Sequence, residues 1–315
     1  MTLKKPDARY EKPIYSSAHF SIDIDGMGKE FPTLRSVDGG GVQAEVIGHQ
    51  IGVQTEVYGE IFRQLGKPKY ADIKLTLGLA DATPFWSWVS ETLKGTPTRK
   101  NGAIIAADYN YKERARRKFE QAMIVGVGFP KWDANAKEQA NITITLAVEK
   151  VTFEKAEDNK ITPKSESETK QKQILACNFT LTFEGFDTIR VTKVDPMEIK
   201  VKTIEHHHGN RIEPLKVPGR IEWPNLVFYV PEVDAEKLRL LHNQQMAGQE
   251  RKPGVAGRSA LLTFHNNKKE EKGSMKLMGL QIFNVSAEKG DATSEEMKLT
   301  KVECAIESIE EFKLA

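Results

Sequence analysis

Hydrophobic and polar residues alternate along much of this 315-residue chain. Phe20, Ile22 and Ile24 are each separated by one polar residue, and a period of two returns at 73–77 and 142–153. Successive side chains of a strand point to opposite faces, so this period predicts strands with one buried face. Further β-prone runs lie at 42–57, 103–107, 121–128, 179–183, 199–201, 226–230 and 261–264. The pattern predicts a mainly β protein.

One segment of the first half has helical spacing instead. Phe85, Trp88 and Val89 lie three and four residues apart, directly after Pro84 and before Gly95. Proline is favoured at the first position of a helix and glycine just beyond its end. The sequence therefore predicts a single helix in this half.

A polar stretch divides the chain. Between 154 and 173, Ile161 is the single large aliphatic residue, which is too little to form a core. We therefore predict an N-terminal arm at 1–17, a first domain at 18–153, a polar linker at 154–174 and a second domain at 175–315.

The order of the predicted elements recurs in the second half. Strand 226–230 matches strand 73–77, and Gly248 ends a second helical segment as Gly95 ends the first. Such self-similarity at a nearly fixed spacing indicates an internal duplication. The sequence predicts two versions of one mainly β domain, each with one α-helix.

Composition and charge narrow the classes of function. The chain has 46 Lys and Arg against 44 Asp and Glu, a net charge of +2 that argues against a general nucleic-acid binder. The sequence contains no apolar run of the length needed to span a membrane, and its N-terminus lacks the apolar core of a signal peptide. Its two cysteines have no metal-binding spacing. We expect no metal, no cofactor and no specific nucleic acid.

Two charged clusters are candidate sites. The histidine triplet at 206–208 could place at most two rings on one face of a strand, so it favours an exposed turn over a metal site. The basic run at 112–118 lacks the interleaved aromatic residues of a nucleic-acid surface and favours a solvated hairpin or a protein contact. The sequence contains no hydrolase, phosphate-binding or zinc-protease motif, so we expect no enzymatic activity.

The first half also carries an ordered set of glycine, aromatic and basic positions. They are Gly26, Tyr58-Gly59, Leu65-Gly66-Lys67-Pro68-Lys69-Tyr70, Ile73, Leu75, Phe85-Trp86-Ser87-Trp88, Gly95, Arg99-Lys100-Asn101 and Asp108. In this order they resemble the contractile-phage tail tube family, which includes tube proteins of extracellular contractile injection systems. The turn at Gly66-Lys67-Pro68 departs from the usual Pro-Gly of that family. The resemblance covers about residues 18–153 well and 175–315 weakly.

The resemblance implies a fold and an assembly. Each half would be a barrel-like sandwich of two β-sheets with one flanking α-helix, and six such domains would close into a ring around a lumen. Three chains would then give a pseudo-sixfold ring, or six chains would carry a second domain outside the lumen. A long hairpin at 42–57 fits an intersubunit element, because ring closure removes exposed strand edges.

The resemblance also implies partners: further copies of the chain, tube, sheath or hub proteins, and a cargo in the lumen. The particle would be a phage tail or injection system assembled in the bacterial cytoplasm, with the chain as a tube ring or a tube–baseplate or hub adaptor. The expected ring or stacking contacts are Tyr58, Gly59, Tyr70, Arg114, Arg116, Arg117, His206, His207 and His208.

Two other classes of protein stay open at this point. A monomeric two-domain binding module could recognise a protein or glycan through tryptophans, and these are Trp86, Trp88, Trp132 and Trp223. An all-β hydrolase would need a carboxylate pair, for which Asp23, Asp25 and Glu45 are available.

Overall fold

Alternation places the apolar side chains of the strands on buried faces. In β5 (Ile73–Gly78), Ile73, Leu75 and Leu77 are buried and Lys74 is exposed. The computed structural model describes residues 17–27, 31–50, 61–79, 83–156, 159, 161, 174–186, 188, 190–248, 257–288 and 297–314. Within them the chain is mainly β, as predicted, with two α-helices.

The first half contains the strands and helix up to residue 155. They are β1 (Phe20–Ile24), β2 (Leu34–Gly39), β3 (Val42–Gln50), β4 (Ile61–Tyr70), β5, α1 (Thr83–Leu93), β6 (Lys100–Ala107), β7 (Glu113–Phe129), β8 (Trp132–Asp133), β9 (Asn141–Ala147) and β10 (Lys150–Lys155).

The second half contains the remaining elements. They are β11 (Phe179–Phe183), β12 (Lys193–Val194), β13 (Met197–His206), β14 (Leu215–Glu222), β15 (Leu226–Pro231), the 3-10 turn η2 (Glu232–Asp234), α2 (Ala235–Met246), β16 (Arg258–His265), β17 (Glu271–Ala287), β18 (Leu299–Ala305) and β19 (Ser308–Leu314).

Strand pairing repeats between the halves. The first half has the order β1-β6-β7-β9-β5-β2, and the second has β11-β16-β17-β18-β15-β12. In each half the longest strand, β7 or β17, also pairs with the last strand, β10 or β19. A hairpin follows the second strand of each half, formed by β3–β4 or by β13–β14. The recurrence predicted from the sequence is therefore present in the hydrogen-bonded topology.

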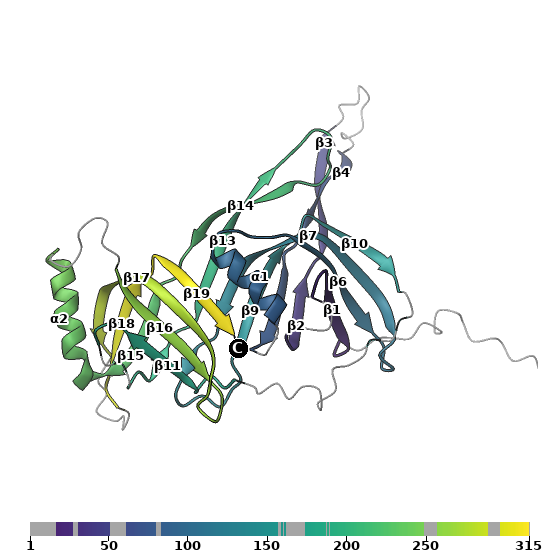
Figure 1. The fold of residues 1–315 in the computed structure, drawn as a ribbon. Helices are drawn as coiled ribbons and strands as arrows, with labels where there is room; N and C mark the ends of the chain where they lie inside the picture. The colour runs from purple at the N-terminus through teal and green to yellow at the C-terminus, as the bar shows by residue number, and fades with distance from the viewer. Residues whose placement is uncertain are drawn as a thin grey trace, which may run out of the picture.

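The two hairpins project from the sheets in the same general direction, and α1 lies between the two halves while α2 lies on the outer side of the second (Figure 1). α1 buries Phe85, Trp88 and Val89, and the Trp88 Nε1 donates a hydrogen bond to the Thr98 carbonyl at 2.9 Å. α2 buries Leu238 and Leu241. One continuous apolar core runs through both halves.

Two predicted strands differ from the observed ones. The run 142–153 forms two strands, β9 and β10, because the chain turns at Val148 and Glu149. β10 also continues to Lys155, two residues into the stretch predicted as linker. Of the predicted hairpin at 42–57, the structure describes only the part that forms β3, and 51–57 lie outside the described residues.

Gly39 links β2 to the hairpin and needs to be glycine. Its φ is +90°, and a Cβ there would lie 2.0 Å from the Asp72 carbonyl oxygen. The Gly39 carbonyl also accepts a hydrogen bond from Arg117 at 3.0 Å. The glycine run at 39–41 thus lets the chain leave the sheet close to β5.

Candidate assembly interface

The hairpin of the second half adds a strand to the sheet of the first. Met197 to Lys200 of β13 pair antiparallel with Phe129 to Gly126 of β7. The same end of β7 pairs on its other side with β9. The edge of β7 is therefore covered by a strand that lies far away in the sequence.

Aromatic side chains from both halves pack together beside the pairing of β13 with β7. Phe312 of β19 packs edge-on against Trp86 of α1, with ring centroids 5.8 Å apart, and against Phe129 of β7 at 5.5 Å. All three side chains are at most 5% exposed. Burial of aromatic rings of this size contributes much of the stability of an interface.

A buried carboxylate holds the polar part of the contact. Glu149 is 2% exposed and lies at the turn between β9 and β10. It accepts hydrogen bonds from Arg99 at 2.8 Å and from the backbone N–H of Lys216 in β14 at 3.1 Å, and Arg211 lies 3.5 Å away. The Lys216 ammonium is itself 3.3 Å from Asp72. A buried charge is tolerated where such partners replace water.

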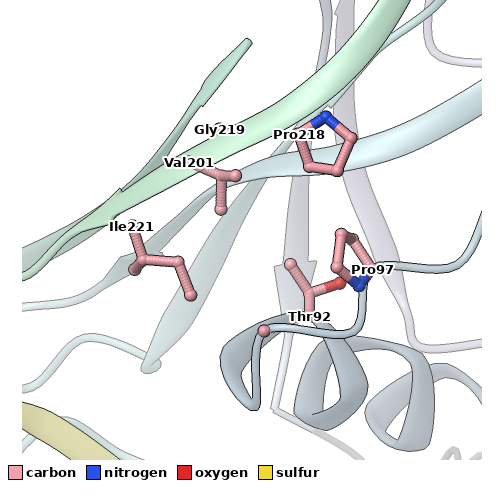
Figure 2. Close-up of a pocket in the computed structure, with 7 residues that line it drawn as sticks. Thr92, Pro97, Val201, Pro218, Gly219 and Ile221 are labelled. Carbon is pink, nitrogen blue, oxygen red and sulfur yellow. The ribbon is translucent and has the colours of Figure 1, made fainter.

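A small cavity lies beside these contacts. Thr92, Gly95 and Pro97 line it from the end of α1, facing Val201, Pro218, Gly219 and Ile221 of the hairpin (Figure 2). Its walls are polar and apolar in about equal parts, and none of the lining residues has a titratable side chain. The cavity therefore reads as a packing gap between the halves, without the chemistry of an active site.

The predicted arginine contacts are largely paired within the chain. Arg114 donates two hydrogen bonds to Asp108 at 2.9 and 2.7 Å, and Arg116 donates two to the buried Glu113 at 2.7 and 3.0 Å. Backbone N–H donation by Lys112 and the Arg114 guanidinium lower the pKa of Asp108. The Arg114–Asp108 pair joins β7 to the turn before it, and the Arg116–Glu113 pair lies within β7. The role of these arginines in contacts between copies stays a prediction.

The histidine triplet lies at the tip of the β13–β14 hairpin, where β13 ends. The rings of His206 and His208 meet edge to face with centroids 4.3 Å apart, and His207 lies 4.0 Å from Glu205. Tyr70 ends β4 and is half-buried, and burial raises its pKa.

Tyr58 and Gly59 lie outside the described residues. Like the histidines and Tyr70, they stay predicted contacts.

The tryptophans expected for a binding module and the carboxylates expected for a hydrolase do not form a common site in the described part of the chain. Trp86, Trp88 and Trp132 are at most 3% exposed, so their rings cannot stack on a glycan from solvent. Trp223 is half-buried and packs against the core. Asp23 and Asp25 are exposed at the end of β1, while Glu45 pairs with Lys69 on the β3–β4 hairpin. Among the residues described, no three potential metal ligands of the His, Cys, Asp and Glu types cluster together. No described helix is long and apolar enough to cross a membrane.

The sequence pattern does not predict the roles of Glu149 and Phe312 or the pairing of β13 with β7. Glu149 sat inside an alternating run and gave no sign of the turn. The pairing itself joins residues about 70 positions apart, a distance over which hydrophobic period carries no information.

The first half of the chain matches a known family model. Residues 16–152 match the family model described as T4-like virus tail tube protein gp19. The resemblance is confirmed for this segment. It spans the first half of the chain up to β10, and the second half lies outside the match. No curated protein matches the chain.

Three solved structures contain similar chains. A chain of the extracellular contractile injection system PVC sheath–tube complex in the extended state is 19% identical, with a TM-score of 0.40 over 48% of this chain and 99% of that one. A chain of the anti-feeding prophage tube-terminating cap is 19% identical, with a TM-score of 0.40 over 50% and 100%. A chain of the anti-feeding prophage baseplate is 11% identical, with a TM-score of 0.33 over 43% and 90%. These scores are too low to support an argument about fold or assembly.

Proposed function

We propose that the protein is a structural component of a tail tube, in a phage or a contractile injection system. The observation that carries this proposal is the family match of residues 16–152 to a tail tube protein. The repeated strand order extends it, because the second half has the same pairing as the matched half. In this role the chain catalyses nothing and acts by forming part of a conduit.

The proposed conduit is a ring of six tube-type domains supplied by three chains. Each half would provide one domain, and the contact between the halves of one chain would be one of the six domain contacts. Long hairpins with unpaired edges favour closure, since an open strand edge promotes uncontrolled association. The ring would then stack on further tube, sheath or hub proteins, with a cargo passing through its lumen.

Charge balance supports stacking. The net charge of the chain is +2, so many copies can come together without strong mutual repulsion. The proposed setting is assembly in the bacterial cytoplasm followed by incorporation into a phage tail or injection particle. Whether the ring repeats along the tube or acts once as an adaptor is tested by counting its copies per particle.

Electron microscopy of the purified protein tests the proposal. Negatively stained particles should be rings with a central hole and six lobes. A monodisperse monomer across the micromolar range would contradict the proposal. A ring of six chains, with the second half outside the central wall, would retain the tube function and overturn the three-chain arrangement.

A further inference from the structure

Irregularities in strand register identify which residues of the two halves are equivalent. The β3–β4 register shifts between Ala44 and Val46, and the β13–β14 register shifts between Val201 and Thr203, 157 residues later. The shift between Ile124 and Gly126 of β7 recurs between Ile282 and Asn284 of β17, 158 residues later. Such bulges are fixed features of a fold and give an alignment of the two halves that does not depend on side-chain type.

This alignment shows what each half lacks. The contact between the halves uses the start of β13 and the end of β7. The equivalent of the start of β13 is 40–43, which leads into β3, and the equivalent of the end of β7 is 284–287, at the end of β17. The segment 284–287 pairs with β18 on one side. On its other side, and on the side of β3 away from β4, no strand of the described part of the chain is paired. One chain therefore contains one formed contact, between β13 and β7. It also presents the two unpaired surfaces, at β3 and at the end of β17, that could form the same contact again.

Apolar residues in the contact inside the chain are buried, and their equivalents on the unpaired surfaces are exposed. Ile199 of β13 is 1% exposed and its equivalent Val42 is 42% exposed. Phe312 of β19 lies opposite Met275 of β17, and Phe153 of β10 lies opposite Arg117, the equivalent of Met275 in β7. The two aromatic residues are therefore equivalent, yet Phe312 is 5% exposed and Phe153 is 68% exposed. Residues that are buried where the two halves of the chain meet thus have equivalents that are exposed on the outer surfaces.

The end of β17 shows the complementary exposure. Val125 of β7 is 9% exposed, and its equivalent Phe283 is 46% exposed. Val127 is buried, whereas its equivalent Val285 is half-buried. Apolar side chains are thus exposed on both surfaces that the contact between the halves would use a second time.

The polar part of the contact has an equivalent as well. The backbone N–H of Glu149 donates to the Glu120 carbonyl, and that of Glu307 donates to the Met278 carbonyl, again 158 residues later. Glu149 is buried under Lys216 of β14, while Glu307 and the equivalent of Lys216, Arg63 of β4, are exposed. The carboxylate and the strand position whose backbone N–H would donate to it thus recur on the two outer surfaces.

Resting on the proposed function, we infer that copies of this chain join head to tail through these surfaces. β3 of one copy pairs antiparallel with the free edge of β17 of the next, with Gly40 to Gln43 opposite Ala287 to Asn284. Phe153 covers the face of the second half that carries α2, and Glu307 receives the β4 strand near Arg63. Because the two surfaces differ, each copy uses one of each, and a closed ring leaves neither uncovered.

Cysteine cross-linking tests the register. Gly41 and Ser286 should lie directly opposite in neighbouring copies, and a Cβ on Gly41 meets no atom within 4 Å. The doubly substituted Gly41→Cys/Ser286→Cys protein is prepared with Cys177→Ser. Cys304 is buried, which raises the pKa of its thiol to about 12, so it does not compete in oxidation.

The chain provides a matched positive control. Gly128 and Glu198 are the equivalent pair inside one chain and lie opposite each other in β7 and β13. Gly128→Cys/Glu198→Cys should lose both free thiols by forming a disulfide within one chain. The single variants Gly41→Cys and Ser286→Cys should stay uncross-linked alone and should form covalent dimers when mixed.

The expected result is that Gly41→Cys/Ser286→Cys gives covalent species larger than one chain for most of the protein on non-reducing gels. If rings form by microscopy and the control disulfide closes, yet no species larger than one chain appears, this interface is wrong and the tube function stands. If the protein stays monomeric, the proposed function and the interface fail together.

Discussion

Glu149 is the residue on which the polar contact between the halves depends. Its buried carboxylate accepts hydrogen bonds from Arg99 and from the Lys216 backbone, at 2.8 and 3.1 Å. Glu149→Gln keeps the shape and removes the charge, leaving Arg99 and Arg211 without their anion. We expect the free energy of unfolding to fall by about 2 kcal/mol in urea titrations.

Glu307→Gln is the matched control for this prediction. Glu307 is the equivalent residue on the outer surface and is exposed in the single chain. In conditions that keep the protein monomeric, the free energy of unfolding should change by less than about 0.5 kcal/mol. Equal losses in both variants would show that Glu149 does not owe its importance to the contact between the halves.

Asp108 makes the free energy of unfolding depend on pH in the acid range. Its pKa is lowered by the backbone N–H of Lys112 and by Arg114, so the carboxylate stabilises the folded state above its unfolded pKa of about 4. That contribution is lost as the pH falls through the lower pKa of the folded state. Asp108→Asn should therefore be less stable than the wild type at pH 7, and the difference should shrink as the pH falls below about 4.

Urea unfolding measured at a series of pH values checks this prediction. Other carboxylates with lowered pKa values, such as Asp133 and Glu303, also lose stabilisation in acid, so only the difference between variant and wild type is informative. Asp23→Asn, at an exposed position of β1, is the control. A difference that stays constant from neutral to acid pH would rule out this role for Asp108.

At the scale of elements, the last strand of each half carries one aromatic residue in the same place. Phe312 of β19 packs on Trp86 and Phe129, whereas Phe153 of β10 is exposed. Phe312→Ala should lower the free energy of unfolding of the monomer by about 3 kcal/mol, because it removes a buried ring.

Phe153→Ala should leave monomer stability within about 0.5 kcal/mol of the wild type and weaken assembly. Sedimentation velocity over a concentration series measures the assembly. Tyr109→Ala removes another exposed ring, in the turn between β6 and β7, and should leave assembly unchanged. If Phe153→Ala assembles like the wild type, β10 does not take part in the contact between copies.

Single elements could be predicted from local sequence where local physics decides them. α1 begins at Thr83 with Pro84 in its first turn and ends before Gly95, whose φ of +83° suits glycine, and period two identified β1 and β5. The break between β9 and β10 could not be predicted, because Val148 is as apolar as a strand residue would be. The chain also turns at the equivalent Ile306 and Glu307, between β18 and β19, where the glutamate is exposed. The turn therefore belongs to the repeated fold, which the period of the sequence does not report.

The candidate site was predicted only in part, for the same reason. The histidine triplet was expected at a turn and lies at the tip of the β13–β14 hairpin. Arg114 and Arg116 stay predicted contacts between copies, and their pairing with Asp108 and Glu113 of the same chain was not predicted. Both pairs depend on the conformation of the turn before β7 and of the start of β7, which charge composition does not contain.

At the scale of the whole molecule, the contact between the halves is asymmetric. A hairpin and an aromatic residue from the second half meet a strand edge, a helix and a carboxylate from the first. Repetition of an asymmetric contact generates a ring if the rotation closes and a filament if it does not. In the proposed ring every chain provides both surfaces, so this ring would need no second type of subunit.

Native mass spectrometry of the assembled particle tests the central claim most directly. The account predicts a dominant species of three times the 35.4 kDa of one chain, because three chains supply six domains. Dissociation in the gas phase should release single chains, and the disulfide-linked Gly41→Cys/Ser286→Cys protein should keep the same total mass. A dominant mass of one chain, or of six, would contradict the three-chain ring.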